Sequence, residues 1–181
     1  MTTQLDELRK QFDDATEQSR RLAGRVSDEV FRKRPRPETW SAAECVQHLN
    51  LTSAAFLPLF DRALSEAEAL PRFSGRYRRD LPGWGLSTML EPPHKQRFKT
   101  PPPFVPGSAQ GRDTVTGEFV RLQEELKARL ARGSGLALTR VKMVSPFNAK
   151  LRYSIYSAFC ITTAHERRHL WQAEHALTAS P

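Results

Sequence analysis

Two histidines stand four residues apart near the end of the sequence, in the stretch AHERRHLWQAE that runs from Ala164 to Glu174. If this stretch is helical, His165 and His169 lie about 40° apart around the axis, because each residue turns a helix by about 100°. Their face also carries small or apolar residues, namely Ala158, Ile161, Thr162, Ala173 and Ala176. Two neutral imidazoles at this spacing can bind one metal ion, as in other helical zinc motifs.

A third histidine, His48, lies in an earlier helical pattern. Its face carries Ser41, Cys45, Thr52, Ala55 and Leu59, so its ring is expected to point toward the core. A single inward histidine is more often a hydrogen-bonded core residue than a ligand. The pair is more demanding, because burying an imidazole without a partner costs about 1–3 kcal/mol. Core rings that find hydrogen-bond partners are the alternative to a metal site.

Three further residues have weaker functional signals. Gln172 falls at about 340° on the His165 face and could hydrogen-bond a histidine ring or a metal-bound water, or simply bond to another core group. The Ser41-x-x-Glu44 spacing predicts a capping box, which favours a helix cap over a general base for Glu44. Cys45 could be a fourth ligand or a redox thiol, but a small buried apolar residue is the favoured interpretation.

Four amphipathic helical patterns must position these residues. They run from Gln4 to about Arg25, from Ser41 to about Ala69, from about Asp113 to Arg132 and from about Ala149 to Ala176. On the last of them, Glu166 and Glu174 are expected on the face opposite the histidines. Pro58 should bend or split the second helix unless its neighbours compensate.

The connections between the helices are of unequal length. Residues 27–39 contain Pro35 and Pro37 and are expected to form a loop. Residues 70–110 hold eight of the thirteen prolines and show no sustained helical or strand period. With no strand run of any weight, the sequence predicts an all-α four-helix bundle in a single domain, residues 1–181. The 70–110 segment is its long crossover between the second and third helices, and it could also cover a site.

Composition limits the class of protein. No stretch approaches the roughly 18 consecutive apolar residues of a membrane span, and the polar N-terminus does not resemble a secretory signal. Two cysteines, Cys45 and Cys160, do not make a disulfide framework. We therefore expect a cytoplasmic protein without a membrane partner.

The charge is strongly basic, with 28 lysines and arginines against 20 acidic residues and a formal net charge of +8. Such an excess can attract nucleic acid, an anionic membrane or a small acidic ligand. The densest basic runs, Arg32 to Arg36, Arg76 to Arg79 and Lys95 to Lys99, lie in proline-broken segments rather than along one helix face. With no nucleic-acid-binding motif visible, we expect no nucleic-acid partner. The runs are interpreted as solvated loops or as a rim that attracts a small anion.

Three stretches together resemble a known family: ETWSAAECVQHL at the start of the second helix, SPFN before the last helix, and TAHERRHLWQ within it. They resemble the DinB family of damage-inducible bacterial proteins, which is related to the YfiT-like proteins and to thiol-dependent transferases. The resemblance covers nearly the whole chain in helix order. It implies a four-helix bundle with a long crossover and a divalent metal ion held by His48, His165 and His169.

The resemblance also implies a class of chemistry. Members with an assigned activity resemble S-transferases or isomerases that use a low-molecular-weight thiol. Imidazole ligands suit zinc or nickel rather than magnesium, and such an ion lowers the pKa of a bound thiol or water. Arg62 and Arg168 are candidates to hold the carboxylates of a small anionic thiol, although Arg168 could equally be a structural ion-pair partner.

The first hypothesis is therefore metal-assisted transfer of a thiol to an electrophile. The alternative is a metal-binding or structural stress-response bundle without turnover, which could be a homodimer. Hydrolysis is less favoured because no general base is evident. DNA binding is also less favoured, because the family name refers to induction and not to contact with DNA.

Overall fold

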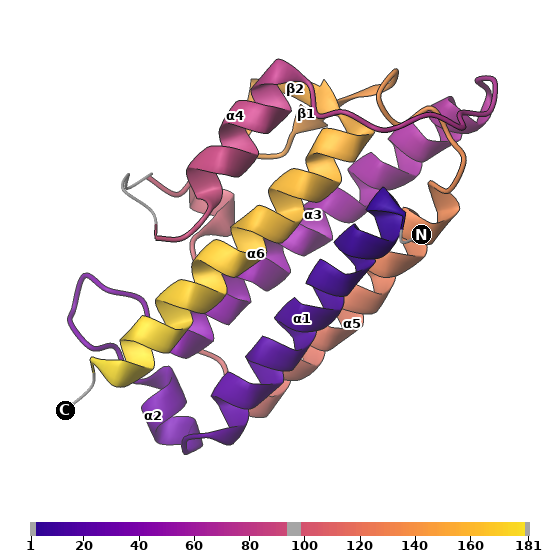
Figure 1. Cartoon of the computed structure of the whole chain (residues 1–181). Helices are drawn as coiled ribbons and strands as arrows, with labels where there is room; N and C mark the ends of the chain where they lie inside the picture. The colour runs from indigo at the N-terminus through magenta and orange to yellow at the C-terminus, as the bar shows by residue number, and fades with distance from the viewer. Residues whose placement is uncertain (1–2, 94–98, 180–181) are drawn as a thin grey trace.

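The computed structural model describes residues 3–93 and 99–179. Four long helices lie alongside one another: α1 (Gln4–Gly24), α3 (Ala42–Glu68), α5 (Arg112–Arg132) and α6 (Ile155–Thr178) (Figure 1). The predicted all-α four-helix bundle is confirmed, with its crossover between α3 and α5. None of the described helices is both long and apolar enough to cross a membrane. The basic run that begins at Lys95 lies outside the described residues, except for Lys99.

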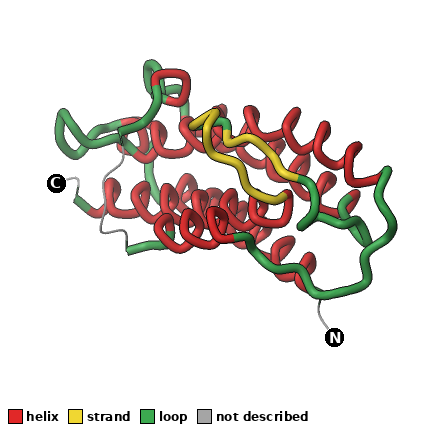
Figure 2. The backbone as a smooth tube through the Cα atoms, turned by 90° about the horizontal axis from the view of Figure 1, so that it is seen from above, coloured by secondary structure: helices red, strands yellow, loops and turns green. Residues whose placement is uncertain are grey.

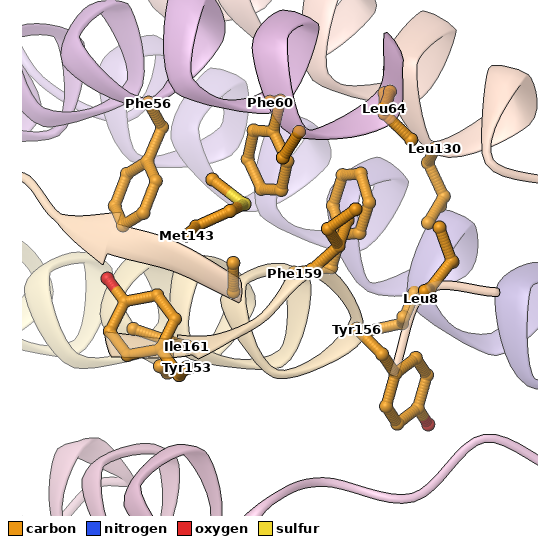
Figure 3. Close-up of a cluster of buried hydrophobic side chains, with 14 of the residues drawn as sticks. Leu8, Phe56, Phe60, Leu64, Leu130, Met143, Tyr153, Tyr156, Phe159 and Ile161 are labelled. Atoms are coloured by element: carbon orange, nitrogen blue, oxygen red, sulfur yellow. The ribbon is translucent and has the colours of Figure 1, made fainter. Parts of the chain in front are cut away.

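Aromatic side chains of α3 and α6 meet in the bundle core. Phe60 of α3 and Phe159 of α6 stack with ring centroids 4.1 Å apart, and both are fully buried. Figure 3 shows Phe56 and Phe60 directed from α3 toward the side chains of α6. Burial of each such side chain contributes about 1.5–3 kcal/mol, so this contact fixes the position of α6 against α3.

Helix α3 begins as the sequence predicts. The Ser41 hydroxyl accepts the Glu44 N–H, and the Glu44 carboxylate accepts the Ser41 N–H at 2.8 Å, which completes the capping box. Pro58 lies inside the helix without splitting it. At the other end of the bundle, Gly133 forms the C-cap of α5, directly after Arg132.

The two predicted connections contain helices that the sequence reading missed. Helix α2 (Asp28–Arg32) forms within residues 27–39, because Ser27 caps it before the prolines begin. The crossover contains α4 (Leu81–Leu90) and the 3-10 turn η1 (Pro102–Phe104). Pro82 is compatible with α4 because the first positions of a helix need no N–H partner within the helix.

A short hairpin precedes the last helix, although no strand was expected. Strands β1 (Lys142–Ser145) and β2 (Asn148–Ser154) pair antiparallel and lie across the helices (Figure 2). The last helix therefore begins at Ile155 and not near Ala149, and Ser154 is its N-cap. A strand of seven residues is too short for its pattern to be separated from the helix that follows it.

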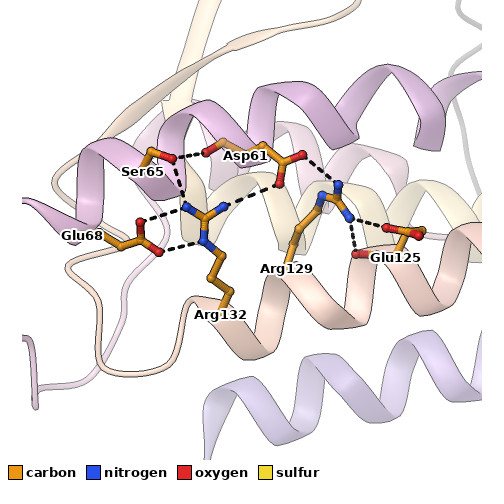
Figure 4. Close-up of polar contacts among 6 residues, drawn as sticks. All are labelled: Asp61, Ser65, Glu68, Glu125, Arg129 and Arg132. Carbon is orange, nitrogen blue, oxygen red and sulfur yellow. Dashed lines mark hydrogen bonds and ion pairs between the residues drawn. The ribbon is translucent and has the colours of Figure 1, made fainter.

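A network of ion pairs joins α3 to α5 on the surface (Figure 4). Arg129 contacts Asp61 at 2.7 Å, and Arg132 contacts Glu68 at 2.7 Å. Because the carboxylates are about half exposed, each pair contributes little alone. Together they favour one register between the two helices.

The crossover is tied to the start of α6 by Asp80. One oxygen of its carboxylate accepts the Gly83 N–H and the Ser157 hydroxyl, while the other accepts the Ser154 N–H at 2.8 Å and contacts the Lys142 ammonium. A Cβ on Gly83 would lie 2.2 Å from the Ser157 Cβ, so only glycine allows this approach of α4 to α6. Burial opposes ionisation of Asp80, but the hydrogen bonds from Lys142, Ser157 and Ser154 outweigh it and lower the pKa.

Replacement of Asp80 by alanine is expected to destabilise the protein by about 2–4 kcal/mol, because α4 loses its N-cap acceptor and the Ser154 N–H and the Ser157 hydroxyl at the start of α6 lose theirs. Urea unfolding measures this loss. The exposed Asp113→Ala is the control and should cost about 0.5 kcal/mol or less. Since the folded pKa of Asp80 lies below its usual value, the stabilisation is complete above about pH 5 and is lost as the pH falls through the folded pKa. Equal losses in the two variants would contradict this role.

Candidate metal centre

Three histidines from two helices converge on one point inside the bundle. His48 comes from α3, and His165 and His169 come from α6. One ring nitrogen of each lies within 4.8 Å of those of the other two. The three residues are 3%, 8% and 7% exposed, so they are interior groups and not surface histidines.

A hydrogen bond from the crossover sets the tautomer of His48. Its Nδ1 lies 2.7 Å from the carbonyl oxygen of Phe104 in η1. A carbonyl can only accept, so Nδ1 carries the proton and Nε2 keeps its lone pair. Histidine ligands in metalloproteins are held by this kind of second hydrogen bond.

The ring nitrogens that face one another have the spacing of ligands to one ion. Nε2 of His48 and Nε2 of His165 are 3.2 Å apart. Two nitrogens at the usual zinc–nitrogen distance of about 2.0–2.1 Å in a tetrahedral site lie about 3.3 Å from each other. Among the residues that the structure describes, Nδ1 of His169 has no hydrogen-bond partner, and it is buried. This unpartnered polar atom and the donor set both fit a bound transition-metal ion.

All three rings are held neutral, the state in which imidazole is a ligand. Burial lowers the pKa of His165 and of His169 well below the usual value, and the neighbouring histidines and Arg168 lower both further. Burial also lowers the pKa of His48, although its bond to the Phe104 carbonyl acts in the other direction. At neutral pH an ion would therefore meet three lone pairs without displacing protons.

Aromatic side chains surround the histidines. Trp40 lies with its ring centroid 5.1 Å from that of His48, and Phe147 lies 5.5 Å from His165. Phe104 packs on Phe147 at 4.9 Å. The crossover and the hairpin thus cover the site. The sequence analysis gives such a covering role as one possibility for the crossover. The roles of Phe104 and Phe147 carried no sequence signal, because they depend on how two connections fold back on the bundle.

The structure shows the surroundings of two residues that the sequence analysis singles out, Gln172 and Cys45. Gln172 hydrogen-bonds His169, which raises the pKa of that ring slightly against the other influences. Cys45 is buried in the apolar cluster beside Leu49 and lies outside the group of possible ligands, with its pKa raised by burial to about 12. It is therefore a small core residue and not a reactive thiol.

Glu44 is occupied by its role at the helix start. Its carboxylate contacts the Arg34 guanidinium at 2.8 Å and also accepts the Ser41 N–H. Burial would raise its pKa, but these partners outweigh burial and keep the pKa below its usual value. An ionised carboxylate held on both sides is a cap and not an available base.

The two candidate arginines lie in different surroundings. Arg62 is 84% exposed, pairs with Glu66 at 3.4 Å and lies fourteen residues after His48, about 21 Å along the helix. The structure does not bring it to the histidines. Arg168 is 4% exposed, and its charge acts on both His165 and His169. It is therefore part of the surroundings of the cluster.

One buried acid lies on the face of α6 that the sequence analysis expects opposite the histidines. Glu166 is 1% exposed and accepts a hydrogen bond from Gln123 of α5 at 2.8 Å. Burial raises its pKa to about 8. This face is buried as well, because α6 is covered by α1, α3 and α4 together (Figure 1), which leaves its first four turns almost no solvent face.

Replacement of Glu44 by glutamine should cost about 1–2 kcal/mol of stability, because the amide cannot reproduce the charged contact with Arg34. Affinity for Zn²⁺ should stay unchanged, since the residue caps the helix and does not face the ion. Urea unfolding and zinc titration measure the two effects. A tenfold loss of zinc affinity with unchanged stability would show that Glu44 acts on the site directly.

Comparison with known proteins adds one finding to this geometry. No curated protein and no solved structure matches the chain. Residues 11–173 match the DinB superfamily, a span that includes all three histidines, Gln172, the whole of α3 and most of α6. The chain belongs to the DinB superfamily.

Proposed function

We propose that this protein binds a divalent transition-metal ion, zinc or nickel, at His48, His165 and His169 and uses it in thiol-dependent transfer to an electrophile. The observation that carries the proposal is the convergence of three neutral imidazoles, two of them with Nε2 atoms 3.2 Å apart. Membership of the DinB superfamily is compatible with a metal-binding enzyme.

The donor set narrows the choice of metal. Three imidazoles without a carboxylate suit zinc, nickel, copper or iron, whereas magnesium and calcium prefer oxygen ligands. Three protein ligands also leave at least one position for another group, which distinguishes catalytic from structural zinc sites. Gln172 beside His169 is placed to orient that ring or a group bound in the open position.

The surrounding residues suit an anionic sulfur compound. A bound ion would supply the positive charge that favours the ionised form of a thiol. Arg168 adds a second positive charge close to His165 and His169. Trp40, Phe104 and Phe147 limit access of water, which strengthens these electrostatic interactions. The partner expected from this arrangement is a small anionic thiol with its electrophilic acceptor.

A non-catalytic metal site is the alternative, and one observation favours it. The three histidines are no more than 8% exposed, and the crossover bonds directly to one of them. A site closed in this way can stabilise the bundle without admitting a substrate. Hydrolysis has less support, since Glu44 is held as a cap and is not available as a base.

Protein purified without an affinity tag should contain close to one equivalent of zinc or nickel. The double variant His165→Ala, His169→Ala should lose it, and His175→Ala should keep it, because His175 is exposed and contacts the Trp171 ring instead. Elemental mass spectrometry measures the content, and thermal unfolding should show a lower Tm after removal of the ion. Absence of metal even after incubation with divalent ions would mean that the histidines serve only the core.

The metal-loaded protein should consume a low-molecular-weight thiol in the presence of an electrophile. A panel of thiols and electrophiles, followed by loss of free thiol, measures turnover. The double histidine variant should lose at least 100-fold in rate, on the order expected when a metal centre is removed, and His175→Ala should retain the full rate. A stoichiometric metal ion that raises the Tm without any turnover would favour the non-catalytic alternative.

A further inference from the structure

A hollow in the protein surface lies near the start of α6, away from the three histidines. It has a volume of about 500 Å³ and is lined by Gln4, Tyr77, Trp84, Tyr156 and three arginines, Arg76, Arg78 and Arg79. Such a volume suits a small-molecule ligand. Tyr156 precedes His165 by nine residues, about 14 Å along the helix. The hollow is therefore separate from the metal centre.

The floor of this hollow is held by hydrogen bonds from three parts of the chain. Gln4 of α1 donates from Nε2 to the Tyr77 carbonyl and to the Tyr156 hydroxyl, both at 3.1 Å, and accepts the Tyr77 N–H at 2.8 Å. The rings of Tyr77 and Tyr156 stack with centroids 5.3 Å apart. Figure 3 shows the Tyr156 hydroxyl directed away from the hydrophobic cluster. The backbone around Tyr77 is thus fixed before any ligand arrives.

Three positive charges lie at this fixed floor, and the described part of the chain places no carboxylate in an ion pair with them. Tyr77 is buried while Arg76, Arg78 and Arg79 on either side of it are exposed, and Arg79 donates to the Ser87 hydroxyl at 2.8 Å. Within residues 3–93 and 99–179 none of the three arginines forms an ion pair. The nearest acid in sequence, Asp80, is already occupied by Lys142 and the start of α6.

An aromatic ring stands at the same hollow with its surface largely open. Trp84, in the first turn of α4, is 53% exposed. Its backbone is fixed, because its N–H donates to the Asp80 carbonyl at 2.7 Å. Exposed tryptophan beside arginine is a combination that binds flat rings by stacking and anions by charge.

We propose that this hollow binds a small ligand that combines a diphosphate with a flat aromatic ring, of the nucleoside diphosphate class. Guanidinium groups match phosphate oxygens in paired hydrogen bonds, and Arg76, Arg78 and Arg79 supply three of them. Trp84 supplies the face on which the ring stacks. The rigid anchor of Tyr77 through Gln4 lowers the ordering cost of binding. This site does not depend on the metal centre.

Calorimetric titration with ADP, inorganic pyrophosphate and adenosine tests the proposal. ADP should bind about tenfold more tightly than pyrophosphate, because its base stacks on the Trp84 ring. Arg76→Ala, Arg78→Ala should lower ADP affinity at least tenfold, and Trp84→Ala should reduce ADP affinity to that of pyrophosphate. The control Arg21→Ala, Arg36→Ala removes the same charge from exposed positions elsewhere and should bind ADP as the parent does.

Two results would overturn the assignment. Absence of ADP binding, or an equal loss in both arginine pairs, would show that no specific site exists at this hollow. Equal affinity for ADP and pyrophosphate in the parent would remove the nucleotide class. Binding that persists in His165→Ala, His169→Ala supports a site independent of the metal centre, whereas its loss there would contradict that independence.

Discussion

The hydrogen bond between His48 Nδ1 and the Phe104 carbonyl connects the crossover to the centre of the bundle. It decides which nitrogen of His48 keeps its lone pair, and so which atom faces His165. The same bond holds η1 against α3, where Phe104 packs on Phe147 of the hairpin. The crossover and the hairpin are therefore both positioned through Phe104. Its carbonyl bonds to His48, and its ring packs on Phe147. Without this bond, His48 would be a core imidazole with a free choice of tautomer.

Burial of polar rings and acids shapes the whole of α6. Helix α6 carries the buried side chains of His165, Glu166, Arg168 and His169. Buried polar groups need hydrogen-bonding or charged partners, and here these partners come from several directions. Gln123 reaches Glu166 from α5, and Gln172 reaches His169 from the next turn. Buried ionisable groups are stable only when they are neutral or paired with an opposite charge. Burial accordingly raises the pKa of Glu166 and lowers the pKa values of His165 and His169.

The sequence predicts the four long helices because their apolar stripes are long and regular. It also predicts that the three histidines face inward. His165 and His169 share one helix face with small or apolar residues, and His48 lies on a similar face of a helix whose start is marked by a capping box. The parts that could not be predicted depend on tertiary contacts. Helix α4 has no polar face to reveal it, β2 merges with the pattern of α6, and the Phe104 carbonyl is a backbone group that no side-chain pattern reveals. Arg62 shares a face with His48, but four turns of helix separate them, which a wheel does not show.

Asp80 and Phe104 are two fixed points on a connection that otherwise contains many prolines. The first is held at the start of α6 and the second at His48. Inserting residues between these two attachment points costs little entropy, because the closure entropy of a loop grows only with the logarithm of its length. An insertion between these two attachment points would therefore change the surface above the bundle at small cost, while Asp80 stays at the start of α6 and the three histidines keep their positions.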